Sequence, residues 1–157
     1  MTTHARGAFD VTLTPQPLDP DGFLGRMTID KRFHGDLEGT SQGQMLAAQT
    51  AVQGSAGYVA IERVRGMIGG RTGTFVLQHS GRMDRGAAEL VITVVPDSGT
   101  EGLAGIRGRM TIVIDGGAHS YDFDYSLPGG GNYQDHCPLC RRRLVTLAQS
   151  RRVGGFG

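Results

Sequence analysis

Short runs of alternating apolar and polar residues, separated by glycine-rich turns, follow one another along most of this chain. Such alternation puts successive side chains on opposite faces of a strand, one face buried and one in water. Gly is poor inside helices and useful at tight turns, and it contributes 26 of the 157 residues. No apolar period of about 3.6 residues persists over three turns in this part, so the pattern predicts an all-β domain.

Eight runs of this kind can be counted, at spacings typical of an antiparallel sheet. They cover residues 6–14, 24–34, 37–47, 56–65, 71–80, 87–95, 106–115 and 118–127. Eight short strands favour closure, because a closed sheet leaves no exposed edge. The prediction is a single eight-stranded antiparallel up-and-down barrel over residues 1–128, with a β-sandwich as the alternative. Residues 129–157 are predicted to be a Gly/Arg-rich extension, either a short helix or disordered.

The pair Gly116-Gly117 predicts the register of the last hairpin. Two adjacent glycines suit a two-residue type I′ turn, which needs a positive φ at both positions. This turn sets Ile112 opposite Tyr121 and leaves one face apolar and the other charged, as expected when one face of a sheet is solvated. We expect His119, which follows the turn, to be exposed.

A second pair, Gly69-Gly70, predicts the register of a middle hairpin by the same reasoning. Here Glu62 lies opposite Leu77, and His79 lies one diagonal step away on the same face. A carboxylate beside an imidazole fixes its tautomer and suits general acid or base chemistry. We therefore take Glu62 and His79 as the candidate catalytic pair, with a hydrogen-bonded structural pair as the alternative.

Residues 24–47 combine an apolar face with polar partners. Lys31 lies among apolar residues, and a turn at Gly35-Asp36 would place Glu38 and Gln42 on the same face. Buried polar groups without partners cost about 1–3 kcal/mol each, so a packed core would not tolerate this face. A lumen filled by water or a ligand would tolerate these polar side chains. Lys31, Glu38 and Gln42 are therefore predicted ligand contacts, with a solvated position at the barrel mouth as the alternative for Lys31 and Glu38.

Three tyrosines are predicted to project into the same interior: Tyr58, Tyr121 and Tyr125. A tyrosine offers an apolar ring with one polar tip, which can orient a ligand. They are candidate ligand contacts, and core packing is the alternative interpretation.

The charge distribution gives the barrel no electrostatic reason to bind nucleic acid. Residues 1–127 hold eleven basic and fourteen acidic side chains, and the last seventeen residues hold five Arg and no acid. No stretch approaches the roughly 20 apolar residues of a membrane span, and the start of the chain lacks the apolar core of a signal peptide. We expect a cytoplasmic protein without nucleic-acid or membrane partners.

Both cysteines lie near the end of the chain, in the run His136-Cys137-Pro138-Leu139-Cys140. Structural zinc needs four ligands, and only three candidates occur here: His136, Cys137 and Cys140. A thioredoxin-like strand–helix–strand setting, which a redox pair would require, is absent. We predict no metal and no cofactor, with zinc completed by a symmetric dimer or by His4 as the alternative.

The run of residues 95–108 (VPDSGTEGLAGIRG) resembles the SGTGxLAGxxG signature of small allene-oxide-cyclase-like barrels. The runs 33–39 (FHGDLEG) and 73–81 (GTFVLQHSG) add to this likeness, which covers about residues 5–128. The chain is similar to an uncharacterised bacterial family of that type. The resemblance implies an eight-stranded calycin-like barrel that is often oligomeric. It does not imply an activity, although related barrels include cyclases that fold reactive intermediates in an apolar lumen.

Three functions follow from these observations. The first is a barrel that binds a small hydrophobic molecule. The second is a cofactor-independent cyclase or isomerase acting on a reactive hydrophobic intermediate, with Glu62 and His79 transferring protons. The third is a non-catalytic interaction module, and in each case we expect a homo-oligomer.

Overall fold

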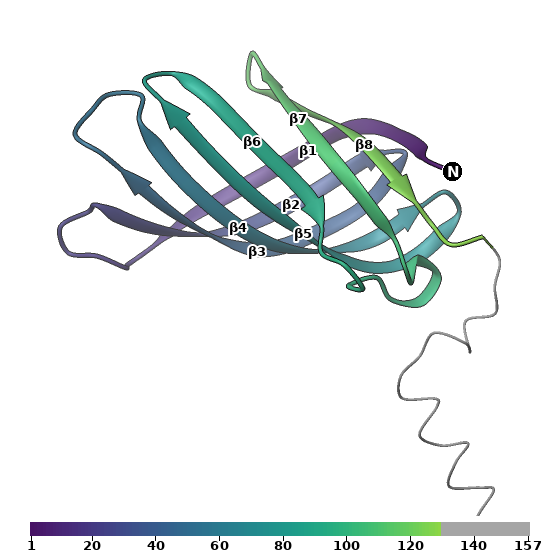
Figure 1. Ribbon diagram of the computed structural model, residues 1–157. Helices are drawn as coiled ribbons and strands as arrows, with labels where there is room; N and C mark the ends of the chain where they lie inside the picture. Colours follow the sequence, from purple (N-terminus) through teal and green to yellow (C-terminus); the bar gives the residue numbers. More distant parts are fainter. Residues whose placement is uncertain (130–157) are drawn as a thin grey trace, which may run out of the picture. The chain divides into compact units, whose positions relative to one another are not determined.

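Eight antiparallel strands close into a barrel in the order in which they occur along the chain (Figure 1). The computed structural model describes residues 1–129, and residues 1–127 form one unit. The strands are β1 (Thr3–Gln16), β2 (Leu24–Gly35), β3 (Leu37–Gln49), β4 (Ala56–Ile68), β5 (Arg71–Asp84), β6 (Ala87–Val94), β7 (Arg107–Asp115) and β8 (Ala118–Ser126), with a short 3₁₀ helix η1 (Glu101–Leu103) before β7. The predicted all-β barrel is confirmed, and the sandwich alternative is wrong.

Both glycine pairs form the turns expected of them. Gly69, Gly70, Gly116 and Gly117 all have positive φ, a conformation that costs glycine little. The observed pairs Ile112–Tyr121, Glu62–Leu77 and Ala60–His79 match the predicted registers. A two-residue turn leaves the flanking strands only one antiparallel alignment, which is why these registers could be predicted.

The predicted register of β2 and β3 is wrong by one residue. Lys31 pairs with Ser41 rather than with Thr40, so Glu38 and Gln42 point out of the barrel and are exposed. Leu37, which is fully buried, takes the inward position at the start of β3. A slip of one residue exchanges the two faces of a strand.

One end of the barrel is filled by apolar side chains. This closed end carries the turns β2–β3 and β4–β5 and the loop of residues 95–106, whose Leu103 and Ile106 are fully buried. The aromatic rings of Phe123 stack on Phe75 and Tyr125, with centroids 5.8 and 5.4 Å apart. Packing of this kind excludes water, so the closed end is the hydrophobic core of the barrel.

The opposite end carries the hairpin connections β1–β2, β3–β4, β5–β6 and β7–β8, and we call it the hairpin end (Figure 1). Side chains that face inward here are only partly covered. Leu13, Met83 and Ile114 are 46%, 38% and 64% exposed, although alternation along their strands puts them on the inner face. Strands β6 and β7 meet at only two residue pairs, so their remaining residues diverge toward this end. Water therefore reaches the inner face from the hairpin end.

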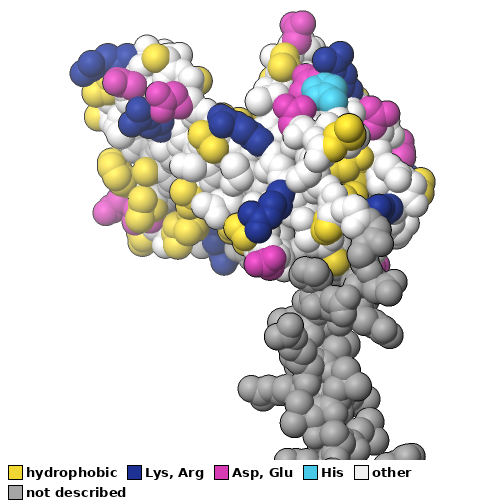
Figure 2. All heavy atoms as spheres, turned by 45° about the vertical axis from the view of Figure 1, so that its right-hand side comes forward, with side chains coloured by type: hydrophobic (Ala, Val, Ile, Leu, Met, Phe, Trp, Pro, Cys, Tyr) yellow, Lys and Arg dark blue, Asp and Glu magenta, His cyan; other side chains and the backbone are white. Residues whose placement is uncertain are grey.

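Hydrophobic side chains also lie among charged ones on the outer surface (Figure 2). On β3 and β4, Leu46, Val59 and Ile61 are each about half exposed. Within the described residues, no helix is long and apolar enough to cross a membrane. The predictions made for His136, Cys137, Cys140 and the C-terminal extension lie outside the described residues.

Candidate functional site

A cluster of four polar side chains lies inside the barrel, and we call Lys31, Ser41, Glu62 and His79 the polar cluster. Lys31 Nζ donates to Glu62 Oε1 at 2.8 Å, and Ser41 Oγ donates to Glu62 Oε2 at 2.7 Å. His79 Nε2 lies 2.8 Å from Glu62 Oε1. Glu62 is fully buried, and the other three are buried as well. The predicted pairing of Glu62 with His79 is therefore present, and Lys31 joins it.

Small residues on β3 allow Lys31 on β2 to reach Glu62 on β4. Gly43 lies directly opposite Glu62 in the sheet, and Ser41 is the next inward residue on the same strand. A Cβ atom at Gly43 would lie 2.6 Å from both Cα and Cβ of Glu62. The absent side chain therefore leaves the space that the carboxylate and the ammonium group share.

Lys31 is the only lysine of the chain. Its Nζ lies 5.1 Å from the ring centroid of Phe9 and 5.8 Å from that of Phe33. Aromatic faces attract a cation electrostatically, and the attraction is larger where water is excluded. These rings and the carboxylate together make a buried ammonium group tolerable.

Glu62 is held in its ionised form. Burial alone would raise its pKa, but the hydrogen bond from His79 and the charge of Lys31 outweigh burial and lower the pKa to about 2. An ionised carboxylate can only accept hydrogen bonds, so all three neighbours act as donors. With so low a pKa, Glu62 is a weak base at neutral pH.

Acid is expected to weaken the fold through Glu62. A carboxyl group whose pKa is lower in the folded state stabilises the fold fully above its ordinary pKa and loses this contribution as the pH falls. For Glu62 the loss spans pH from about 4.5 down to about 2. The free energy of unfolding in urea, compared between the wild type and Glu62→Gln across this pH range, measures the loss. The wild type should lose stability more steeply than the variant, and parallel losses would contradict this assignment.

Tyr58 is the one predicted tyrosine that borders the polar cluster. It lies on the inner face two residues before Ala60, which is opposite His79, and its ring covers Gly81. Burial, together with the negative charge of Glu62, raises the pKa of its hydroxyl group. Tyr58 is half-buried, so it lies between the polar cluster and the hairpin end.

The other two predicted tyrosines belong to the closed end. Tyr121 Oη accepts a hydrogen bond from Leu37 N at 2.9 Å and donates to His34 O at 3.0 Å, which anchors the turn between β2 and β3. Tyr125 is buried in the apolar core, as the alternative interpretation of core packing predicts. Neither contacts the polar cluster through a hydrogen bond in the described part of the chain.

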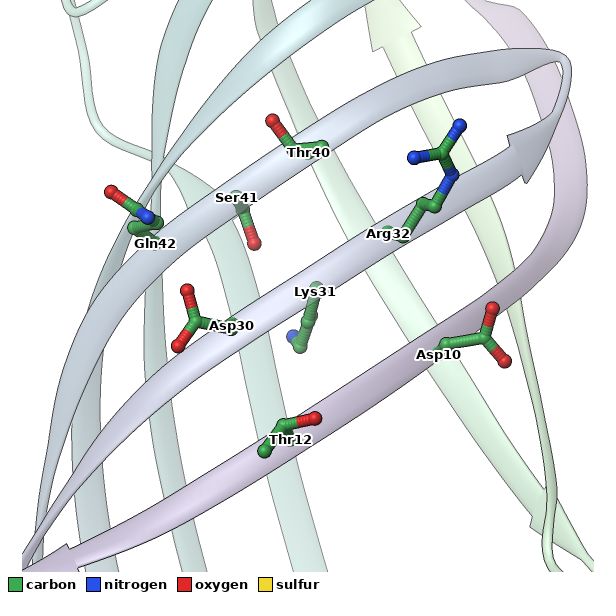
Figure 3. Close-up of a pocket in the computed structure, with 8 residues that line it drawn as sticks. All are labelled: Asp10, Thr12, Asp30, Lys31, Arg32, Thr40, Ser41 and Gln42. Carbon is green, nitrogen blue, oxygen red and sulfur yellow. The ribbon is translucent and has the colours of Figure 1, made fainter.

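Glu38 and Gln42 do not face the interior, so the predicted basis for their contact with a ligand is wrong. Glu38 Oε1 instead accepts a hydrogen bond from Gly35 N at 2.8 Å and closes the turn. Gln42 lines a shallow depression of about 370 Å³ on the outer face of β1–β3, together with Asp10, Asp30 and Arg32 (Figure 3). The side chains of Lys31 and Ser41 project from the opposite, inner face of the same strands (Figure 3).

Sequence reasoning missed two contributors to the site. Ser41 would have been found with the correct β2–β3 register, because that register places it beside Lys31. His119 faces inward rather than into solvent, and its ring centroid lies 5.1 Å from that of Phe9. Alternation from Tyr121 puts His119 on the inner face, but no local signal in the sequence indicates that its ring packs against Phe9, on a strand far away in the chain. Among the described residues, no group of His, Cys, Asp and Glu has the arrangement of a metal site.

Comparison with known proteins places this barrel in a family. The model of the family described as "Protein of unknown function (DUF3224)" matches residues 5–125. The chain belongs to the DUF3224 family. A solved structure of a DUF3224 protein of unknown function from Shewanella oneidensis MR-1 is 49% identical in sequence, with a TM-score of 0.78. The match covers 83% of this chain and 100% of that one. No curated protein matches this DUF3224 chain.

Proposed function

We propose that this DUF3224 protein binds a small, mainly apolar molecule at the hairpin end of its barrel, with the polar cluster at the base of the site. The observation that carries the proposal is the contrast between the two ends of one interior. Inward side chains are buried at the closed end and partly exposed at the hairpin end. An eight-stranded barrel is wide enough for one small ligand.

The side chains at the hairpin end suit an apolar ligand. Met27, Met45 and Met83 all lie on inward positions of their strands and are incompletely buried. Methionine is unbranched and flexible, so it repacks around ligands of different shapes. Ligand sites in general combine an apolar lining with a few polar groups that fix orientation. The polar cluster and the hydroxyl group of Tyr58 are the polar groups here.

Two tryptophan substitutions at neighbouring positions test the site with the apolar dye N-phenyl-1-naphthylamine. Ala47 follows Met45 on the inner face of β3 and is opposite Tyr58, whereas Ala48 points outward. A tryptophan at Ala47 would fill the hairpin end, so Ala47→Trp should lower dye affinity about tenfold or more, or at least about 1.4 kcal/mol. Ala48→Trp should leave the affinity unchanged. Dye fluorescence titrated against each full-length variant gives both values.

A loss of dye affinity at the control position would contradict the proposal. Ala47 and Ala48 both line a depression of about 400 Å³, together with Leu46, Tyr58 and Val59. Loss of dye binding in Ala48→Trp, whether alone or together with Ala47→Trp, would place the bound dye in this depression rather than inside the barrel. That outcome would overturn the proposal and favour the interaction-module hypothesis. Absence of dye binding to the wild type would also overturn it.

A cyclase or isomerase of the allene-oxide-cyclase-like type is the second candidate. The observation that favours it is the buried hydrogen bond between Glu62 and His79, because carboxylate–imidazole pairs serve in proton transfer. An apolar site that holds one conformer of a flexible substrate would supply the remaining catalysis through orientation. This candidate needs turnover, whereas ligand binding alone does not.

A further inference from the structure

Glu62 is shielded from a ligand by burial and by its three hydrogen-bond donors. Its Oε1 accepts hydrogen bonds from both Lys31 and His79, its Oε2 accepts one from Ser41, and the side chain is fully buried. A carboxylate with three donors around it, sealed from solvent, cannot also contact a molecule that enters from the hairpin end. The role of Glu62 must therefore be exerted through its neighbours.

The carboxylate decides which nitrogen of His79 carries a proton. Because ionised Glu62 only accepts hydrogen bonds, the hydrogen of His79 must be on Nε2, which lies 2.8 Å from Oε1. In the neutral ring, Nδ1 is then an unprotonated acceptor. No hydrogen bond to His79 Nδ1 occurs within residues 1–129. His79 itself is buried, with 4% of its surface exposed.

The cross-strand neighbours of His79 are apolar. Its cross-strand neighbours are Ala60 on β4 and Ile92 on β6, and the ring of Tyr58 lies over Gly81, the next inward residue of β5. Both neighbours are buried, as is His79. An acceptor nitrogen in an apolar setting recognises a hydrogen-bond donor on an otherwise apolar molecule.

We propose that His79 Nδ1 is the atom that meets the ligand, that Glu62 is a positioning residue, and that the ligand is an apolar molecule carrying a hydroxyl group. This inference rests on the proposed binding function. The hydroxyl group donates its hydrogen to Nδ1. A carboxylate ligand has no hydrogen to donate at neutral pH.

A matched pair of probes tests the class of ligand. 2-Naphthol and 2-methoxynaphthalene share an apolar ring system, but only the naphthol can donate a hydrogen bond. Displacement of N-phenyl-1-naphthylamine from the wild type should show 2-naphthol binding about tenfold more tightly, as expected for one additional hydrogen bond. Equal displacement by both compounds would overturn this inference while leaving the proposed function intact. Failure of the dye itself to bind would instead overturn the proposed function.

Two substitutions of His79 separate its nitrogens. A glutamine amide reaches the position of Nε2 and can still donate to Glu62, whereas an asparagine amide occupies the position of Nδ1. His79→Gln should lose the preference for 2-naphthol, and His79→Asn should retain a preference. A preference that survives in His79→Gln would overturn the assignment of Nδ1.

The tautomer can be measured without any ligand. ¹⁵N chemical shifts of the histidine rings distinguish a protonated from an unprotonated nitrogen, and the His79→Gln spectrum assigns the His79 signals. The wild type should show Nε2–H and bare Nδ1. In Glu62→Gln this single tautomer should be lost, because the glutamine amide can donate as well as accept. A wild-type spectrum with the proton on Nδ1 would overturn the positioning role of Glu62.

Discussion

Replacing Glu62 by glutamine is expected to lower the free energy of unfolding by about 3–5 kcal/mol at pH 7. Lys31 is only 9% exposed as a residue, so the substitution leaves its ammonium group without a counter-charge inside the barrel. Removing one partner of a buried ion pair leaves the other charge unpaired in the interior. The resulting loss of stability is larger than the net stability that the intact pair provides. Urea unfolding followed by circular dichroism measures the change.

A double substitution distinguishes a stranded charge from general disruption of the core. In Lys31→Met with Glu62→Gln both charges are removed, so the loss should be smaller than the sum of the two single losses by about 0.5–3 kcal/mol. Glu38→Gln is the matched control, because Glu38 is exposed at the β2–β3 turn, and it should change stability by less than about 0.5 kcal/mol. Strict additivity of the two single losses would contradict the ion pair.

Replacing Gly43 by alanine is expected to lower the free energy of unfolding by about 3 kcal/mol, at the upper end for an added methyl group in a packed site. The new Cβ would meet the carbonyl oxygen of Ile61 and would lie 2.6 Å from Cα of Glu62. Backbone atoms in a hydrogen-bonded ladder cannot move aside as a flexible side chain can. The strand would have to shift, which would also displace the carboxylate from Lys31 and His79.

Gly25 on the neighbouring strand provides the control for Gly43. A Cβ at Gly25 would meet no atom within 4 Å, and the φ of Gly25 is not positive. Gly25→Ala should therefore be neutral, or should stabilise by up to about 1 kcal/mol through the reduced freedom of the unfolded chain. Thermal unfolding of both variants side by side gives the comparison. Equal stability of Gly43→Ala and wild type would show that Glu62 does not occupy the observed position.

Local signals in the sequence were sufficient wherever a turn fixed the alignment of its two strands. The pairs Gly69-Gly70 and Gly116-Gly117 each allow one tight turn, so the register of β4 with β5 and of β7 with β8 could be predicted residue by residue. This is why Glu62 and His79 were correctly placed on one face. The inward orientation of Tyr58 follows from the same alignment.

The turn between β2 and β3 lacks such a signal. Its geometry depends on contacts from other parts of the barrel: Tyr121 bonds to Leu37, and the carboxylate of Asp36 accepts a hydrogen bond from Arg6 N. These partners lie on β8 and β1, far away in the sequence. The predicted alignment was therefore wrong by one residue, and Glu38 and Gln42 were placed on the wrong face.

The amino-acid sequence by itself determined the strands, their number and two hairpin registers, because alternation and paired glycines act between near neighbours in the chain. Tertiary structure alone decided that Lys31 reaches Glu62 across β3 and that the interior is packed at one end and partly exposed at the other. These features depend on how the strands stagger when the sheet closes. Closing the sheet into a barrel requires the alignments of all eight strand pairs to be mutually consistent. No single segment of the sequence specifies all of these alignments.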